Sequence, residues 1–150
     1  MKEVDVWKWS KYLSEWVSEY DPVLSNVIKK LPDLLTKPMK DVVRFIARLG
    51  DTPEFPYKRR EISCFVTSTV IWSLYAFFCH PDDYFEAVCT SIWTGGDVDT
   101  TAAITGAISG ARVGLDNIPE EYALQLHDLG QWMKTDLEKL TKTLFDLKCG

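Results

Sequence analysis

Residues 100–114 are almost all small, and this segment restricts the folds open to the chain more than any other. Gly106, Gly110 and Gly114 recur at four-residue spacing, although each glycine weakens an isolated helix by about 1 kcal/mol. Such a helix is stable where its small face lets another backbone come close. We expect the three glycines to pack against another helix, with the apolar segment 63–79 as the partner. A membrane Gly-x-x-x-Gly pair is the alternative, but the segment is short and contains Arg112 and several threonines.

The rest of the chain has the periodicity of helices. In residues 4–20, apolar side chains recur every three or four positions and predict one helix face in the core and at its rim: Val6, Trp9, Leu13, Trp16 and Tyr20. Residues 51–60 contain two prolines and three consecutive cations and form the clearest loop. Proline, glycine and aspartate separate the expected helices, which cover residues 4–20, 22–31, 42–49, 63–79, 81–93, 100–114, 119–130 and 133–147. We predict an all-α fold, a compact helical bundle in a single domain 1–150.

Charge and hydropathy exclude several classes of function. Lysine and arginine number 17 against 22 aspartate and glutamate residues, which leaves a net charge of −5. A protein that binds nucleic acid needs a cationic surface, so we expect no nucleic acid as a partner. No apolar run reaches the roughly 20 residues of a membrane span, and the first twelve residues carry charges throughout. We therefore expect no membrane partner and a cytoplasmic location.

The hexapeptide Gly95-Gly96-Asp97-Val98-Asp99-Thr100 is the motif with the clearest chemistry. Side chains at i and i+2 of an extended or turning backbone lie on the same side, so Asp97 and Asp99 can converge, with Thr100 adding a neutral oxygen. Clustered oxygens suit a hard cation such as Mg²⁺ or Mn²⁺. Capping of the following helix is the alternative, in which Asp97 or Asp99 accepts backbone N–H bonds. The sequence leaves both interpretations open.

The longer segment GGDVDTTAAITGAISGARVG, residues 95–114, closely resembles the C-terminal signature of the ADP-ribosylglycohydrolase family. The resemblance extends over residues 63–128 and, more loosely, over residues 7–35. It implies an all-α, magnesium-dependent hydrolase that cleaves the glycosidic bond between ADP-ribose and a protein side chain or a small acceptor. It also implies a binuclear Mg²⁺ centre with Asp97, Asp99 and Thr100 as metal ligands, and a loop of Gly95 and Gly96 near the ribose. The implied partner is an ADP-ribosylated protein or an ADP-ribose metabolite.

The chain also departs from this family in its length. Members are longer, and their other metal ligands lie in an N-terminal half, at an early acidic position and in a Thr-Asp-Asp type motif that this chain lacks. We therefore expect either a magnesium-dependent hydrolase or a non-catalytic, truncated or split helical module that binds a partner chain or, weakly, ADP-ribose. In both cases we expect weak Mg²⁺ binding and an exposed apolar patch lined by tryptophan and phenylalanine around the 95–100 loop. Such a patch would favour self-association or binding of a complementary N-terminal fragment.

Overall fold

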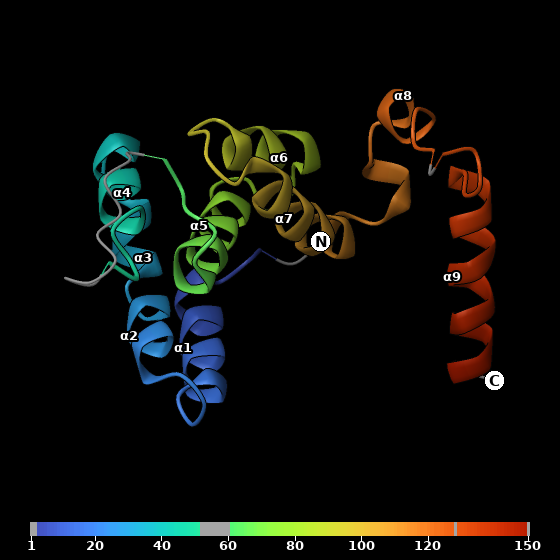
Figure 1. The fold of residues 1–150 in the computed structure, drawn as a ribbon. Coiled ribbons are helices and arrows are strands. Elements are labelled where there is room, and N and C mark those ends of the chain that lie inside the picture. Colours follow the sequence, from blue (N-terminus) through green and yellow to red (C-terminus); the bar gives the residue numbers. More distant parts are fainter. Residues whose placement is uncertain (1–2, 52–60, 128, 150) are drawn as a thin grey trace.

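The computed structural model describes residues 3–51, 61–127 and 129–149, and this part of the chain is all-α, as predicted (Figure 1). It contains no strand within those residues, only the isolated bridges Ile62–Gly96 and His127–Met133. The helices are α1 (Val6–Val17), α2 (Pro22–Ile28), α3 (Leu31–Leu35), α4 (Met39–Ile46), α5 (Val66–Cys79), α6 (Tyr84–Ile92), α7 (Val98–Val113), the 3-10 helix η1 (Leu115–Asn117), α8 (Glu120–Ala123) and α9 (Lys134–Cys149). The loop expected at residues 51–60 lies, from residue 52 on, outside the described residues.

Aspartate caps begin the first two helices. The Asp5 carboxylate accepts the backbone N–H of Lys8 at 3.0 Å, and the Asp21 carboxylate accepts that of Leu24 at 2.9 Å. The second helix was expected to continue to Pro32, but α2 ends at Ile28 and Pro32 lies in the first turn of α3. Proline fits a first turn because the backbone N–H it lacks has no partner within the helix there.

The face of α1 that enters the core differs from the predicted one. Val6, Leu13 and Val17 pack partly buried against the core, and between them lie the buried Ser10 and Ser14. These small serines let α2 approach closely, and the Ser25 hydroxyl donates to the Ser14 carbonyl at 2.8 Å. Three of the residues expected in the core or at its rim, Trp9, Trp16 and Tyr20, are instead exposed.

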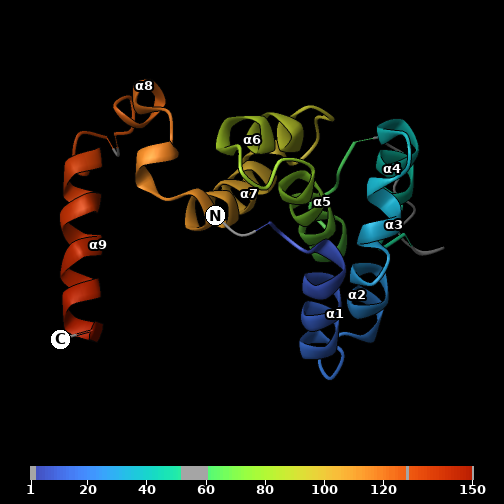
Figure 2. The ribbon, with the colours of Figure 1, turned by 180° about the vertical axis from the view of Figure 1, so that it is seen from behind.

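Helix α5 is the centre of the molecule. It lies between the N-terminal helices α1–α4 and the pair α6–α7 (Figures 1 and 2). Its Ile71 and Trp72 are fully buried, in a core shared with α2, α3 and α4. The Trp72 ring stacks on Tyr75 with 5.2 Å between centroids, and its Nε1–H donates to the Ser91 carbonyl at 2.8 Å. This bond satisfies the one polar atom of the Trp72 side chain and ties α5 to the last turn of α6.

The glycine face of α7 packs against α6, so the partner predicted for it was wrong. A Cβ added at Gly106 would lie 3.2 Å from the Tyr84 hydroxyl, and one at Gly110 would lie 3.7 Å from the Tyr84 ring. A Cβ added at Gly114 would have no neighbour within 4 Å, and this residue ends the helix with a φ of +80°. Helix α5 instead meets the hydroxyl face of α7, where Thr105 donates to the Ser73 carbonyl at 3.4 Å. Small hydroxyl side chains allow a close helix approach as glycines do, and they can also bond across it.

The chain beyond α7 lies at the edge of this core. None of residues 114–127 and 129–148 is buried. Helix α9 lies apart from helices α1–α7, at the opposite end of the molecule from α3 and α4 (Figures 1 and 2). Over the parts of the chain described here, we find no helix long and apolar enough to cross a membrane.

Candidate functional site

The Gly95–Gly96 loop leads into α7, and the backbone at its end is hydrogen-bonded to the segment that precedes α5. The backbone N–H of Asp97 donates to the Ile62 carbonyl at 3.0 Å, next to the bridge between Ile62 and Gly96. Gly96 has a φ of +87°, and a Cβ at this position would overlap the Ile62 carbonyl oxygen. Gly95 also has a positive φ, of +73°, but a Cβ there would meet only the Glu61 side chain, at 3.7 Å. The close approach of two backbones therefore requires glycine at Gly96.

A buried threonine, Thr101, anchors the start of α7. Its hydroxyl lies 3.1 Å from the Asp97 carbonyl and 3.4 Å from the carbonyl of Ser91, the same oxygen that accepts the Trp72 indole N–H. The first turn of α7 is thereby tied to α6 and α5. Sequence reasoning missed both Thr101 and Ile62. The adjacent Thr100-Thr101 pair could have indicated the buried role of Thr101. Neighbouring residues of a helix point in different directions, so if Thr100 faces the candidate metal site, Thr101 is free to face the core.

The side chains predicted to hold a cation meet at this first turn. The Thr100 hydroxyl donates to Asp97 Oδ1 at 2.9 Å. Asp97 occupies the N-cap position of α7 and is half-buried, but its carboxylate accepts no backbone N–H there. The capping interpretation therefore does not describe Asp97, whose carboxylate is engaged by Thr100.

Asp99 shares the same small volume. A hydrogen bond with the Asp97 side chain lowers the pKa of Asp99, and the backbone N–H groups of Asp99 and Thr100 lower it further. Both Asp99 and Thr100 are exposed. The two carboxylates and the hydroxyl thus lie together at the surface, with donors that offset the repulsion between the carboxylates.

The donor set is chemically suited to a hard cation but small. All three side chains offer oxygen, the ligand type that Mg²⁺ prefers, whereas a full octahedral shell takes about six ligands. In the described part of the chain, no group of three or more histidine, cysteine, aspartate or glutamate residues is placed to hold a metal ion. Asp97, Asp99 and Thr100 therefore fit part of a magnesium site, and the remaining ligands must be water or groups from outside this turn.

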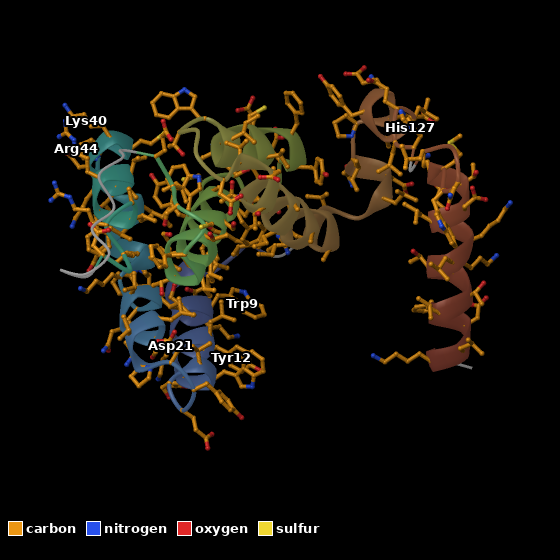
Figure 3. The ribbon with its side chains drawn as sticks, viewed as in Figure 1. Trp9, Tyr12, Asp21, Lys40, Arg44 and His127 are labelled. Carbon is orange, nitrogen blue, oxygen red and sulfur yellow. The ribbon has the colours of Figure 1, made fainter. Side chains whose placement is uncertain are left out.

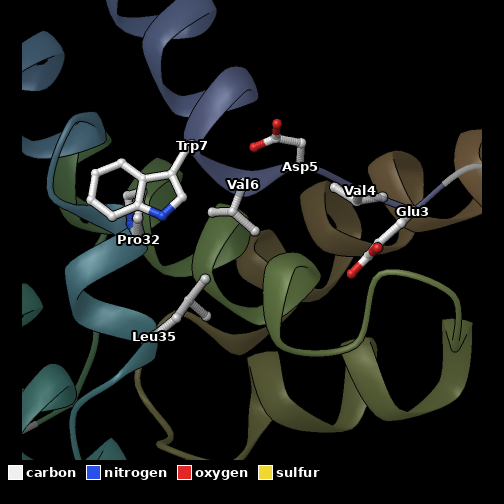
Figure 4. A pocket seen from close by; sticks show the side chains of 7 residues that line it. All are labelled: Glu3, Val4, Asp5, Val6, Trp7, Pro32 and Leu35. Atoms are coloured by element: carbon white, nitrogen blue, oxygen red, sulfur yellow. The ribbon is translucent and has the colours of Figure 1, made fainter.

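Several cavities lie elsewhere in the described part of the molecule, among them the following two. One of about 520 Å³ lies between residues 3–7 and α3, where the nearby Asp5 carboxylate is already engaged as a helix cap (Figure 4). The other, of about 660 Å³, is mainly apolar and lies between α9 and the segment 115–126. Neither is lined by residues 95–100, so the three oxygens do not open into either cavity.

Comparison with known proteins supports the family that the motif in residues 95–114 resembles. A model of the ADP-ribosylglycohydrolase family matches residues 4–150. The ADP-ribosylhydrolase ARH3 of Danio rerio is 34% identical over 64 residues, which are 43% of this chain and 16% of that protein. The glycohydrolase of ADP-ribosyl-dinitrogen reductase from Rhodospirillum rubrum is 32% identical over 71 residues, which are 47% of this chain and 24% of that protein. The matches thus span about a sixth and a quarter of these relatives. No solved structure matches the chain with significance.

Proposed function

The chain belongs to the ADP-ribosylglycohydrolase family, and from this premise we propose that it carries part of the magnesium site of a hydrolase acting on ADP-ribose linkages. The observation that carries the proposal is the meeting of Asp97, Asp99 and Thr100 at the first turn of α7. The printed names of both relatives support an ADP-ribosyl group as the substrate class, on a protein or on a smaller acceptor.

Each residue of the turn has a distinct role in this proposal. The carboxylates of Asp97 and Asp99 and the hydroxyl oxygen of Thr100 would hold the cation, and the Thr100 hydroxyl also orients Asp97 by donating to its Oδ1. Gly95 and Gly96 leave the loop without side chains, so the ribose can approach its backbone. When bound, Mg²⁺ supplies a Lewis acid and a template that positions the ribose and the attacking water. Thr101 and Ile62 hold the turn in place from behind.

A non-catalytic helical module is the second candidate function. It is favoured by the small donor set, since three protein ligands replace few of the waters that Mg²⁺ holds tightly. On this interpretation the chain binds ADP-ribose weakly or pairs with another polypeptide. Both candidates predict weak Mg²⁺ binding at the same turn, and they differ in the release of ADP-ribose.

Titration calorimetry with MgCl₂ tests the site. We expect a weak binding heat from the native chain and none from the double variant Asp97→Ala plus Asp99→Ala. The matched control is Asp33→Ala plus Asp41→Ala, which removes two first-turn carboxylates from α3 and α4 and leaves the 95–100 turn intact. Equal heats from all three proteins would refute the metal site.

Release of ADP-ribose distinguishes the two functions. The native chain is incubated with arginine- and serine-ADP-ribosylated proteins, with Mg²⁺ or with a chelator. Because the donor set is small, we expect little or no release by the chain alone, together with binding of free ADP-ribose that depends on Asp97 and Asp99. Efficient magnesium-dependent release would show that these three ligands suffice and would eliminate the non-catalytic module.

A further inference from the structure

Helix α1 and the turn that follows it carry a row of exposed aromatic side chains. Trp9, Tyr12 and Trp16 lie on α1 at three- and four-residue steps, the spacing of one helix face, and Tyr20 lies four residues further on, in the turn 18–20. They are 48%, 59%, 70% and 81% exposed, respectively. Trp9 and Tyr12 point to the same side of α1, away from α2, and meet edge to face with 6.0 Å between their centroids (Figure 3). We call these four residues the aromatic face.

The aromatic face is larger than the apolar patches that monomeric proteins usually leave in contact with solvent. Helix α1 already packs its other side, Val6, Leu13 and Val17, against the core. Monomeric proteins rarely expose a contiguous apolar patch of more than a few hundred Å². With about 200 Å² for each ring, the exposed fractions amount to roughly 500 Å² on one copy of the chain. A face of this size marks an interaction surface.

The charges beside the aromatic face indicate what covers it. Lys8 and Lys11 lie on one flank near the start of α1. Glu15 lies on the same flank towards its end, and Glu19 follows at four-residue spacing in the turn after the helix. All four side chains are exposed, and Lys11 is 3.9 Å from Glu15. The flank is therefore positive at one end and negative at the other, with its midpoint near residue 13.

Such a flank is complementary to itself when reversed. In an antiparallel pair of α1 helices related by a two-fold axis, residue i faces residue j and residue j faces residue i. With the axis near residue 13 or 14, Lys8 faces Glu19 and Lys11 faces Glu15 of the second copy. The same axis places Tyr12 opposite Trp16 and Trp9 opposite Tyr20. In a parallel two-fold pair the charged flank of one helix would instead lie beside the opposite flank of the other, so these lysines and glutamates would not meet.

We propose that two copies of this chain associate through the aromatic face of α1, antiparallel about a two-fold axis. Two copies bring roughly 1,000 Å² of aromatic surface together, and the stems of the flanking lysines and glutamates extend it to about 1,200 Å², the lower end of specific interfaces. An interface near this lower limit is typical of a weak, transient dimer. The inference stands independently of the proposed hydrolase function, because no residue of the 95–100 turn takes part.

Sedimentation equilibrium of the full chain, from low to high micromolar concentration, is the test. We expect a monomer–dimer equilibrium that Trp16→Ser weakens at least about tenfold, since a central aromatic contact is lost from both copies. Lys8→Glu plus Lys11→Glu makes the flank wholly negative, and Glu15→Lys plus Glu19→Lys makes it wholly positive. Each of these variants should dimerise at least about tenfold more weakly on its own, because like charges then face each other.

Mixing the two charge variants provides the sharpest result. The wholly negative and wholly positive chains should form a heterodimer, and the fourfold reversal of Lys8, Lys11, Glu15 and Glu19 should restore the homodimer. The matched control is Lys40→Glu plus Arg44→Glu on α4, which changes the net charge as Lys8→Glu plus Lys11→Glu does and should leave dimerisation unchanged (Figure 3). Circular dichroism verifies that each variant is folded.

Two outcomes would overturn the proposal. A native chain that stays monomeric over the whole concentration range would leave the aromatic face to a different polypeptide. A dimer that none of the α1 variants weakens would place the contact elsewhere, for instance on the exposed leucines of α9.

Discussion

At the scale of single residues, Gly96 allows the loop before α7 to lie against the backbone of Ile62, and this contact positions the candidate metal ligands. Replacing it with alanine forces a Cβ onto the Ile62 carbonyl at a positive φ, so we expect Gly96→Ala to lower the free energy of unfolding by about 2 kcal/mol. Gly95→Ala is the matched control, because its Cβ has room and only the φ is unfavourable. It should cost about 1 kcal/mol. Urea denaturation measures both, and equal losses would show that the loop is not held against Ile62.

The ionisation of Asp99 is a second property of a single residue. Its pKa is lowered in the folded chain, chiefly by the hydrogen bond with Asp97. A lowered pKa means that the ionised carboxylate favours folding above the unfolded pKa of about 3.9, and that this contribution is lost as the pH falls through the folded pKa. Without divalent cations, carboxyl NMR should show Asp99 titrating below its ordinary range. Asp97→Ala should raise that pKa towards the ordinary value, and an unchanged titration would contradict the contact between the two side chains.

At the scale of helices, the contact between α6 and α7 depends on Tyr84. A Cβ at Gly110 would make ordinary contacts, 3.6 Å from Ile118 and 3.7 Å from Tyr84, so Gly110→Ala should stabilise the chain by about 1 kcal/mol through helix propensity. At Gly106 the Cβ would lie 3.2 Å from the Tyr84 hydroxyl, and this crowding should cancel the gain.

Removing the hydroxyl checks that explanation. In the Tyr84→Phe background the crowding at Gly106 is relieved, so Gly106→Ala should then stabilise the chain as Gly110→Ala does. Thermal unfolding of the single and double variants measures the coupling between the two positions. Independent, additive effects would mean that Tyr84 does not determine the need for glycine at Gly106.

At the scale of the whole molecule, stability resides in the part of the chain before η1. Because none of residues 114–127 and 129–148 is buried, deletion of residues 134–150 should leave the unfolding midpoint of the remaining helices nearly unchanged. Ile46→Ala, at a fully buried position of α4, is the positive control and should cost about 3 kcal/mol. Circular dichroism against temperature compares the two. A large loss on deletion would show that α9 contributes to the core.

The sequence by itself determined the fold class, the approximate positions of α5, α6 and α7, and the residues of the candidate site. These features depend on signals that act within three or four residues: hydrophobic period, aspartate and proline at helix starts, and glycines before the Asp97–Thr100 turn. Whether Asp97, Asp99 and Thr100 bind Mg²⁺ stays a prediction, as does the division of the chain into a single domain.

Only the tertiary structure decided which side of each helix is covered. On α1 the serines face inward and the aromatic residues outward, and on α7 the glycines meet α6 while the hydroxyl face meets α5. Small residues allow close packing on either face, so the local pattern fits both arrangements. The choice between them depends on neighbours far along the chain, such as Ser25 against Ser14 and Ile62 against Gly96.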